Sequence, residues 1–186
     1  MTLPRFIALW SPAPGCGKSA VAGLLCAQAG YGLMPFATPI KEMAIALLLQ
    51  AGYSPTIARK AVWEDKEAPL TYLPGKPTAR HLLRTLGTEW GRNCIHSELW
   101  ISVWESTARQ AGYGIADDVR FPNEAAAVRR LGGELWAVTR PGYADDSGHA
   151  SEAGLGDVEF DRVIVNDGSL LDLARQVQGI CAGGSR

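Results

Sequence analysis

The chain has 186 residues, with 18 Lys and Arg against 19 Asp and Glu; its formal net charge is −1, and 47% of its residues are hydrophobic. A chain of this length and hydrophobic content can bury a core of normal size, which excludes an intrinsically disordered protein. The near-zero charge argues against broad electrostatic binding to DNA or to an anionic membrane. It does not exclude a small anionic substrate, because a few basic side chains in a cleft are sufficient.

The cysteines and the hydropathy pattern indicate the compartment. Cys16, Cys26, Cys94 and Cys181 form no Cys-x-x-Cys pair and no zinc-type cluster, so we expect free thiols in a reducing cytosol. No apolar stretch reaches the roughly 18 residues that a membrane span needs. Residues 1–10 lead into a segment rich in Pro and Gly rather than into a cleavage site. The sequence therefore predicts a cytoplasmic protein without a signal peptide or a membrane span.

The first half of the chain is predicted to be mainly helical. Residues 5–10 are expected to form a buried strand, and a Pro- and Gly-rich loop follows. A helix of small and apolar residues is expected over 18–29. Residues 31–36 form either a second strand or an extended link. Apolar periodicity predicts four further helices, over residues 40–51, 54–63, 78–90 and 99–111, with a charged loop over 64–77.

The second half alternates strands and helices. A short strand is expected over 115–119, and a helix over 122–131 has Pro122 in its first turn and two glycines past its end. Two further strands and a last helix are expected over 134–139, 162–165 and 169–177. Such alternation is typical of a parallel sheet with crossover helices, so the predicted fold class is α/β.

A candidate phosphate-binding loop lies between the first strand and the first helix. Gly15-Cys16-Gly17-Lys18-Ser19 occupies the context that a P-loop requires. In such a loop, backbone N–H groups and the helix dipole bind phosphate, while the lysine reaches the β- and γ-phosphates of ATP and the serine hydroxyl ligates Mg²⁺. Pro12 stands where the motif has its first glycine and lacks an N–H group. Phosphate binding can survive this change, because the N–H groups that cradle phosphate come later in the loop.

Acidic residues follow the strand predicted over 115–119. Asp117 and Asp118 end this strand, and Arg120 comes two residues later. The carboxyl ends of parallel strands line the ligand crevice of an open α/β sheet. A carboxylate there can hold Mg²⁺, and an arginine can bind a phosphate. The alternation of side chains does not decide which of the two aspartates faces the crevice.

Several blocks of the sequence resemble the phage-type deoxynucleoside monophosphate kinases, a branch of the P-loop nucleoside monophosphate kinase superfamily. The most specific blocks are 82–92, Leu-Leu-Arg-Thr-Leu-Gly-Thr-Glu-Trp-Gly-Arg, and 118–124, Asp-Val-Arg-Phe-Pro-Asn-Glu. Weaker blocks lie at 36–42, 149–152 and 165–168. The resemblance implies a P-loop NTPase fold of three α/β/α layers around a central parallel sheet. It also implies transfer of the γ-phosphoryl group of ATP, with Mg²⁺, to a deoxynucleoside 5′-monophosphate.

The resemblance further implies how such a kinase is organised. We expect a single domain over 1–186, with its core in residues 1–35, 112–139 and 158–186, a helical monophosphate-binding region over 36–111 and a lid over 140–157. Its expected partners are ATP and a deoxynucleoside monophosphate, for phage DNA precursor supply in the host cytoplasm. No stable binding of nucleic acid or membrane is expected, and a homodimer is compatible with the sequence.

The site residues implied by the resemblance fall into four groups. Residues expected to bind ATP are Ala13, Pro14, Gly15, Cys16, Gly17, Lys18, Ser19, Ala20 and, in an adenine-binding turn, Asn166. Residues expected to bind the monophosphate are Lys41, Arg80, Arg84, Thr88, Glu89, Trp90, Arg92, Arg120 and His149. The expected catalytic residues are Lys18, Asp118, Arg120 and Arg140, and the expected metal ligands are Ser19, Asp117 and Asp118. Arg84 stands where the family has glutamine, either as a reader of a guanine carbonyl or phosphate or as a surface residue.

Two other functions stay open. One is a related P-loop kinase with another acceptor, such as dephospho-coenzyme A or a modified base in DNA. The other is a nucleotide-binding module without catalysis, whose loop Pro12 impairs. A GTP switch is disfavoured, because the sequence lacks the Asn-Lys-x-Asp element that reads guanine.

Overall fold

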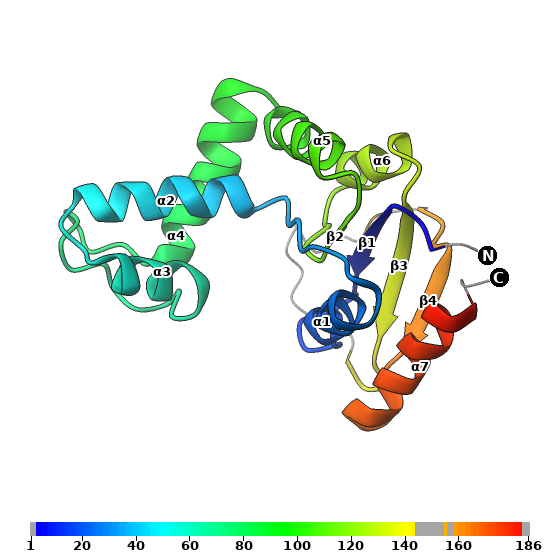
Figure 1. The fold of residues 1–186 in the computed structure, drawn as a ribbon. Helices are drawn as coiled ribbons and strands as arrows, with labels where there is room; N and C mark the ends of the chain where they lie inside the picture. The colour runs from blue at the N-terminus through cyan, green and yellow to red at the C-terminus, as the bar shows by residue number, and fades with distance from the viewer. Residues whose placement is uncertain (1–2, 144–154, 156–157, 184–186) are drawn as a thin grey trace. The chain divides into compact units, whose positions relative to one another are not determined.

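The computed structural model describes residues 3–143, 155 and 158–183. The chain forms two compact units, which are treated separately below (Figure 1). Unit 1 consists of Met1–Phe36 and Trp104–Arg186, and unit 2 consists of Ala37–Val103. The expected lid over 140–157, apart from its first four residues and Leu155, lies outside the described residues, and so does His149.

Unit 1 is built on a parallel sheet of four strands, which confirms the predicted α/β class. The strands are β1 (Phe6–Trp10), β2 (Gly114–Ala116), β3 (Glu134–Thr139) and β4 (Arg162–Val165), in the order β2-β1-β3-β4. The register pairs Ile7 with Ile115 and Leu9 with Trp136. Parallel strands align their carboxyl ends along one edge, so the segments that follow β1 and β2 lie at the same edge of the sheet.

Helices cover both faces of this sheet (Figure 1). On one face, α1 (Lys18–Ala29) and α7 (Leu170–Gly183) pack on alternate strand residues through a cluster that includes Ile7, Leu9, Val21, Leu25, Ile115, Trp136, Val138, Ile164, Leu173 and Val177. On the other face, α6 (Pro122–Arg130) packs against β1 and β3. The period of two along each strand explains why successive strand residues serve opposite faces.

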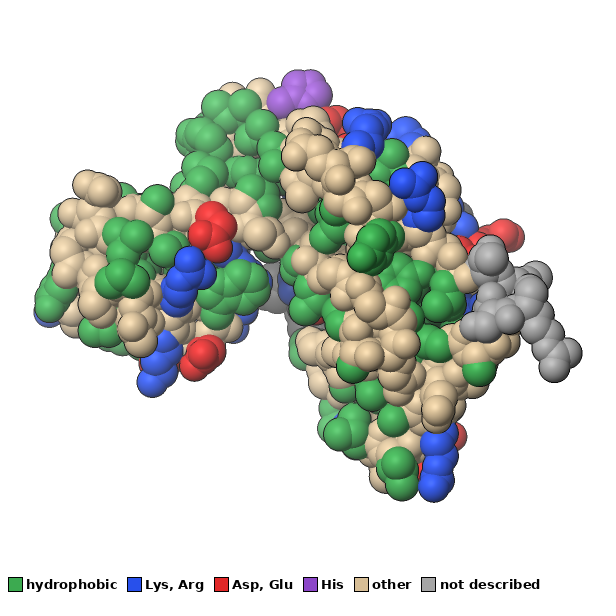
Figure 2. Space-filling view, in the orientation of Figure 1, with side chains coloured by type: hydrophobic (Ala, Val, Ile, Leu, Met, Phe, Trp, Pro, Cys, Tyr) green, Lys and Arg blue, Asp and Glu red, His purple; other side chains and the backbone are tan. Residues whose placement is uncertain are grey.

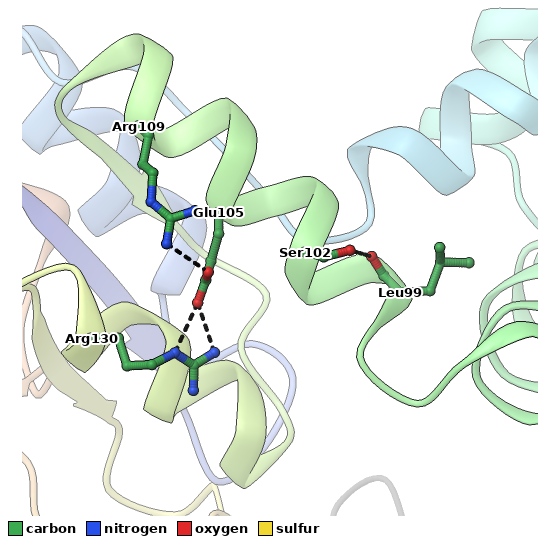
Figure 3. Close-up of polar contacts among 5 residues, drawn as sticks. All are labelled: Leu99, Ser102, Glu105, Arg109 and Arg130. Atoms are coloured by element: carbon green, nitrogen blue, oxygen red, sulfur yellow. Dashed lines mark hydrogen bonds and ion pairs between the residues drawn. The ribbon is translucent and has the colours of Figure 1, made fainter.

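Glu105 ties two helices of unit 1 together. It lies in α5 (Leu99–Ala111), which begins in unit 2 and ends in unit 1. Its carboxylate accepts hydrogen bonds from Arg109 at 2.9 Å, within α5, and from Arg130 of α6 at 2.7 Å (Figure 3). The Glu105 side chain is only 13% exposed, so this pair of arginines compensates a largely buried charge.

The chain leaves unit 1 after Phe36 and returns to it at Trp104, and these two residues lie against each other. Their rings stack with centroids 4.5 Å apart and an interplanar angle of 18°. The Trp104 indole N–H also donates to the Met34 carbonyl oxygen at 2.7 Å. The exit and the return of the chain are therefore held side by side within unit 1.

Unit 2 is helical. Its helices are α2 (Thr38–Gln50), α3 (Pro55–Trp63), α4 (Ala79–Arg84), the π-helix η1 (Thr85–Ile95) and the start of α5. Two of them begin with the expected capping chemistry: the Ser54 hydroxyl accepts the Ile57 N–H at 3.4 Å, and the Thr78 hydroxyl accepts the His81 N–H at 3.1 Å. The core of unit 2 contains Ala44, Ile45, Leu48, Ala58, Val62, Leu70 and Ala79.

The winding of η1 differs from the single α-helix expected over 78–90. Leu82, Leu83 and Leu86 pack on the core of unit 2, whereas Trp90 is 40% exposed. The Trp100 indole N–H donates to the Gly87 carbonyl oxygen at 2.7 Å. A β carbon at Gly91 would lie 2.4 Å from Trp100 Nε1, so the Trp100 ring occupies the space that this glycine leaves open.

Other differences from the predicted elements are small. The strand expected over 115–119 is the three-residue β2, and the last helix extends to Gly183. The segment 31–36 is a link with one isolated bridge, between Leu33 and Ile115. Among the described residues, no helix has the length and apolar character that a membrane crossing needs. On the face drawn in Figure 2, Lys and Arg side chains occur at separate places, several of them beside acidic side chains.

Candidate active site

The candidate phosphate loop connects β1 to α1 at the carboxyl edge of the sheet. Gly15 and Gly17 have φ angles of 83° and 105°, in the left-handed region that other residues rarely adopt, and Gly17 caps the start of α1. Cys16 between them is 1% exposed. The Ser11 hydroxyl donates to the Ala13 carbonyl oxygen at 2.9 Å, on either side of Pro12. Lys18 and Ser19 follow as the first residues of α1, as the P-loop prediction requires.

Side chains that follow β3 and β4 pack on both glycines of this loop. A β carbon at Gly15 would lie 3.0 Å from the Tyr143 ring, and one at Gly17 would lie 2.6 Å from Asn166 Nδ2. Arg140 lies above the Tyr143 ring, with its guanidinium carbon 4.9 Å from the centroid. The structure therefore places the predicted site residue Asn166 against the phosphate loop, and Arg140 against the Tyr143 ring that packs on the same loop.

The acidic segment after β2 lies within electrostatic range of Lys18. Burial lowers the pKa of the Lys18 ammonium, and the positive charge of Arg120 lowers it further; the negative charges of Asp117 and Asp118 act in the opposite direction. Four predicted site residues are thus brought together in unit 1. The arrangement holds two cations and two carboxylates beside a loop suited to phosphate.

Asp118 is held by the backbone of the link that follows α1. Asp118 Oδ1 accepts the backbone N–H of Phe36 at 2.8 Å, which fixes the carboxylate to the link that follows α1. Within residues 3–143, 155 and 158–183, no group of three His, Cys, Asp or Glu side chains could hold a metal ion. Serine hydroxyl and carboxylate oxygens nevertheless fit Mg²⁺, which proteins often bind through one or two side chains together with substrate phosphates and water. Ser19, Asp117 and Asp118 are suitable donors of this kind.

Glu124 was not among the predicted site residues. It is 4% exposed, the one charged side chain of the described residues that is buried. Its Oε2 accepts the backbone N–H groups of Arg120 at 2.9 Å and Phe121 at 3.2 Å. Glu124 is the third residue of α6, and by accepting these backbone N–H groups it caps the start of the helix. It holds the backbone of the segment that carries Arg120. The available signal was an acidic residue in the first turn of the helix predicted over 122–131.

The candidate monophosphate-binding residues of unit 2 lie on two helical stretches. Lys41 of α2 has its ammonium 3.6 Å from the centroid of the Trp63 ring. Arg80 of α4 forms an ion pair with Glu67, and Arg92 of η1 donates to the Ser97 carbonyl oxygen at 3.3 Å. The side chains of Arg84, Thr88, Glu89 and Trp90 are exposed.

Comparison with known proteins decides the family. A sequence model of the family described as deoxynucleotide monophosphate kinase matches residues 73–177, more than half of the chain. The chain belongs to the deoxynucleotide monophosphate kinase family. The resemblance seen in blocks 82–92 and 118–124 is confirmed, since both blocks lie inside the matched region.

Individual relatives of this kinase come from viruses. A protein of Acanthamoeba polyphaga mimivirus, whose name assigns it provisionally to this activity, is 29% identical over 181 residues, which cover 88% of this chain and 89% of the relative. The deoxynucleotide monophosphate kinase of Escherichia phage RB69 is 27% identical over 147 residues, 76% of this chain and 59% of its own length. That of Enterobacteria phage T4 is 31% identical over 106 residues, 54% of this chain and 44% of its own length. The kinase thus spans about half the length of these two phage relatives.

The partly buried ammonium of Lys18 predicts a pH-dependent stability of this kinase. Its pKa in the folded protein is lower than the ordinary 10.5, so between these two values the unfolded chain binds more protons and the free energy of unfolding rises with pH. The cost of burying the charge is largest at pH values below the pKa of the folded state, and it is lost as the pH rises toward 10.5. We expect Lys18→Met to raise the melting temperature of the ligand-free kinase at pH 7, with a gain that shrinks as the pH approaches 10.5. Calorimetric melting of both proteins over this range checks it, and equal melting temperatures at every pH would contradict it.

Proposed function

We propose that this chain transfers the γ-phosphoryl group of ATP to a deoxynucleoside 5′-monophosphate and releases the diphosphate. The observation that carries the proposal is the gathering of Lys18, Asp117, Asp118 and Arg120 beside a glycine-rich loop, in a member of the deoxynucleotide monophosphate kinase family. Phosphoryl transfer needs little covalent chemistry from the protein, so catalysis consists of positioning and charge stabilisation. These residues supply both.

Each residue of unit 1 has a defined part in this proposal. The N–H groups of residues 13–19 and the Lys18 ammonium bind the phosphates of ATP, and Arg120 binds the acceptor phosphate. Mg²⁺, held by Ser19 and an aspartate, supplies neutralisation of phosphate charge when bound. Arg140 stabilises the charge of the transferring group. No strong general base is required, because the acceptor phosphate is already anionic at neutral pH.

Unit 2 is proposed to bind the monophosphate. Lys41, Arg80, Arg84 and Arg92 offer positive charge, and Thr88, Glu89 and Trp90 offer polar and aromatic contacts. The Lys41–Trp63 and Arg80–Glu67 contacts of the ligand-free protein are then exchanged, at least in part, for contacts with the nucleotide. We propose that the protein works in the host cytoplasm, on free nucleotides.

A panel of acceptors tests the function. The four deoxynucleoside monophosphates, ribonucleotide controls, dephospho-coenzyme A and duplex DNA are each incubated with ATP and Mg²⁺, and ADP formation and product mass are measured. We expect diphosphate from at least one deoxynucleoside monophosphate, formed about 10³-fold more slowly when Lys18→Met replaces the wild type. Transfer only to dephospho-coenzyme A or DNA, or ATP binding without transfer to any acceptor, would contradict the proposal.

A further inference from the structure

A side chain from near the end of the chain holds the candidate phosphate loop. Asn166 is the first residue after β4, and its Nδ2 donates to the Cys16 carbonyl oxygen at 3.0 Å, across 150 residues of sequence. The backbone N–H of Asn166 donates to the Thr139 carbonyl oxygen at 2.8 Å. The position of Asn166 is therefore fixed by the end of β3, and the amide group of its side chain reaches the loop from a rigid base.

The loop is shaped to accept this amide. Gly17 has a φ of 105°, and a β carbon there would lie 2.6 Å from Asn166 Nδ2, which is closer than non-bonded atoms approach. Cys16 is 1% exposed, so water has little access to this residue. Removing the hydrogen-bond donor of a carbonyl group in such surroundings destabilises the folded conformation of the loop. Glycine at position 17 and asparagine at position 166 thus form a matched pair.

We propose that Asn166 is a positioning residue that orients the phosphate loop for every nucleoside triphosphate donor, whatever its base. A trans peptide unit is planar, with its C=O and N–H groups pointing in opposite directions. The bond from Asn166 holds the Cys16 carbonyl group toward the β4 end, so the N–H of Gly17 in the same peptide unit points away from it, to the side on which phosphate is expected. The proposal rests on the proposed function. It gives Asn166 a role distinct from the adenine contact that the family resemblance implies.

Pro12 makes this support more important here than in a loop with the full glycine motif. Proline removes one N–H group from the start of the loop and fixes its own φ angle. The loop is instead held by contacts from outside its backbone: the Ser11 hydroxyl on the Ala13 carbonyl oxygen at 2.9 Å, the Tyr143 ring against Gly15, and the amide of Asn166. Of these, the Asn166 bond alone acts directly on a peptide unit between the two glycines.

The first test measures the loop without any ligand. Asn166→Ala removes the donor, and Asn166→Asp keeps the shape of the side chain while replacing the N–H donor by an acceptor. Gln176→Ala is the matched control, because Gln176 Nε2 donates to the Val165 carbonyl oxygen at 3.0 Å, one residue before Asn166, rather than to a carbonyl oxygen of the loop. We expect faster hydrogen–deuterium exchange in residues 11–20 of both Asn166 variants, and unchanged exchange in Gln176→Ala. Unchanged exchange in all three would overturn the proposal.

The second test separates loop positioning from base recognition. The β,γ-imido analogues of ATP and GTP are titrated with Mg²⁺ into each protein by calorimetry. Loss of one hydrogen bond to a buried group predicts about tenfold weaker binding. We expect this factor to be the same for both analogues, with the KM of the monophosphate unchanged. Weakening confined to the adenine analogue would overturn the proposal and assign Asn166 to the base.

The two proposals fail in different ways. If the wild type phosphorylates no acceptor while loop exchange responds to Asn166, the proposed function is wrong and the role of Asn166 in the loop stands. If the wild type phosphorylates a deoxynucleoside monophosphate and the Asn166 variants match it in donor affinity and loop exchange, the proposed function stands. The positioning role of Asn166 is then wrong. Melting temperatures of all variants are measured alongside, and Asn166→Asp provides the data if Asn166→Ala does not fold.

Discussion

Replacing Lys18 by methionine is expected to reduce phosphoryl transfer by about 10³-fold, the effect of removing one preorganised charge that stabilises the transition state. Lys18 is the first residue of α1, within electrostatic range of Arg120 and both aspartates. Methionine keeps most of the length of the side chain and removes only the ammonium. The measurement is the initial rate of diphosphate formation at saturating ATP and acceptor.

A control for folding accompanies this result. The same variant is expected to melt at or above the temperature of the wild type at pH 7, because it no longer buries a charge. A low rate together with a retained melting temperature assigns the loss to chemistry. If Lys18→Met transferred phosphate at the rate of the wild type, the assignment of the phosphate loop would be wrong.

Replacing Gly91 by alanine is expected to lower the free energy of unfolding by about 1–3 kcal/mol, the usual cost of overpacking a filled interior. The new β carbon would lie 2.4 Å from Trp100 Nε1, and relief of this clash displaces the indole from the Gly87 carbonyl oxygen. Urea unfolding measures the change. Because η1 carries Thr88, Glu89 and Arg92, we also expect the KM of the monophosphate to rise, with the KM of ATP unchanged.

Gly179→Ala is the matched control for this variant. Gly179 lies in α7, and a β carbon there would have no atom within 4 Å. Alanine is favoured over glycine inside a helix, so this variant is expected to be as stable as the wild type or more stable. Equal urea unfolding curves for Gly91→Ala and Gly179→Ala would contradict the prediction. They would show that the Trp100 ring moves away from the new methyl group without a loss of stability.

The sequence predicted those elements whose bounds depend on residues that are close together in the chain. The strands over 134–139 and 162–165 and the helix over 99–111 have the predicted bounds, because each is an apolar or periodic run that ends near glycine or polar residues. The phosphate loop was predicted for the same reason, since its glycines, lysine and serine are consecutive. The cap made by Glu124 was also within reach, since it depends on a spacing of a few residues.

The remaining features depend on contacts between distant residues. The Trp100 ring packs on Gly91 of the π-helix η1 and donates to the Gly87 carbonyl oxygen, and no periodicity within 85–95 contains these contacts. The bond from Asn166 to the phosphate loop spans 150 residues. Asp118 was predicted as a catalytic residue and metal ligand, but its hydrogen bond to Phe36 becomes visible only when the strand and the link are placed together.

The stack of Phe36 on Trp104 has a consequence for how such a chain can vary. Because the two ends of the segment 37–103 are anchored side by side in unit 1, that segment is topologically a loop with adjacent ends. The entropy of closing a loop grows only slowly with its length, so residues can be added to or removed from the segment without separating Phe36 from Trp104. Evolution can therefore lengthen, shorten or reshape unit 2 independently of the sheet of unit 1.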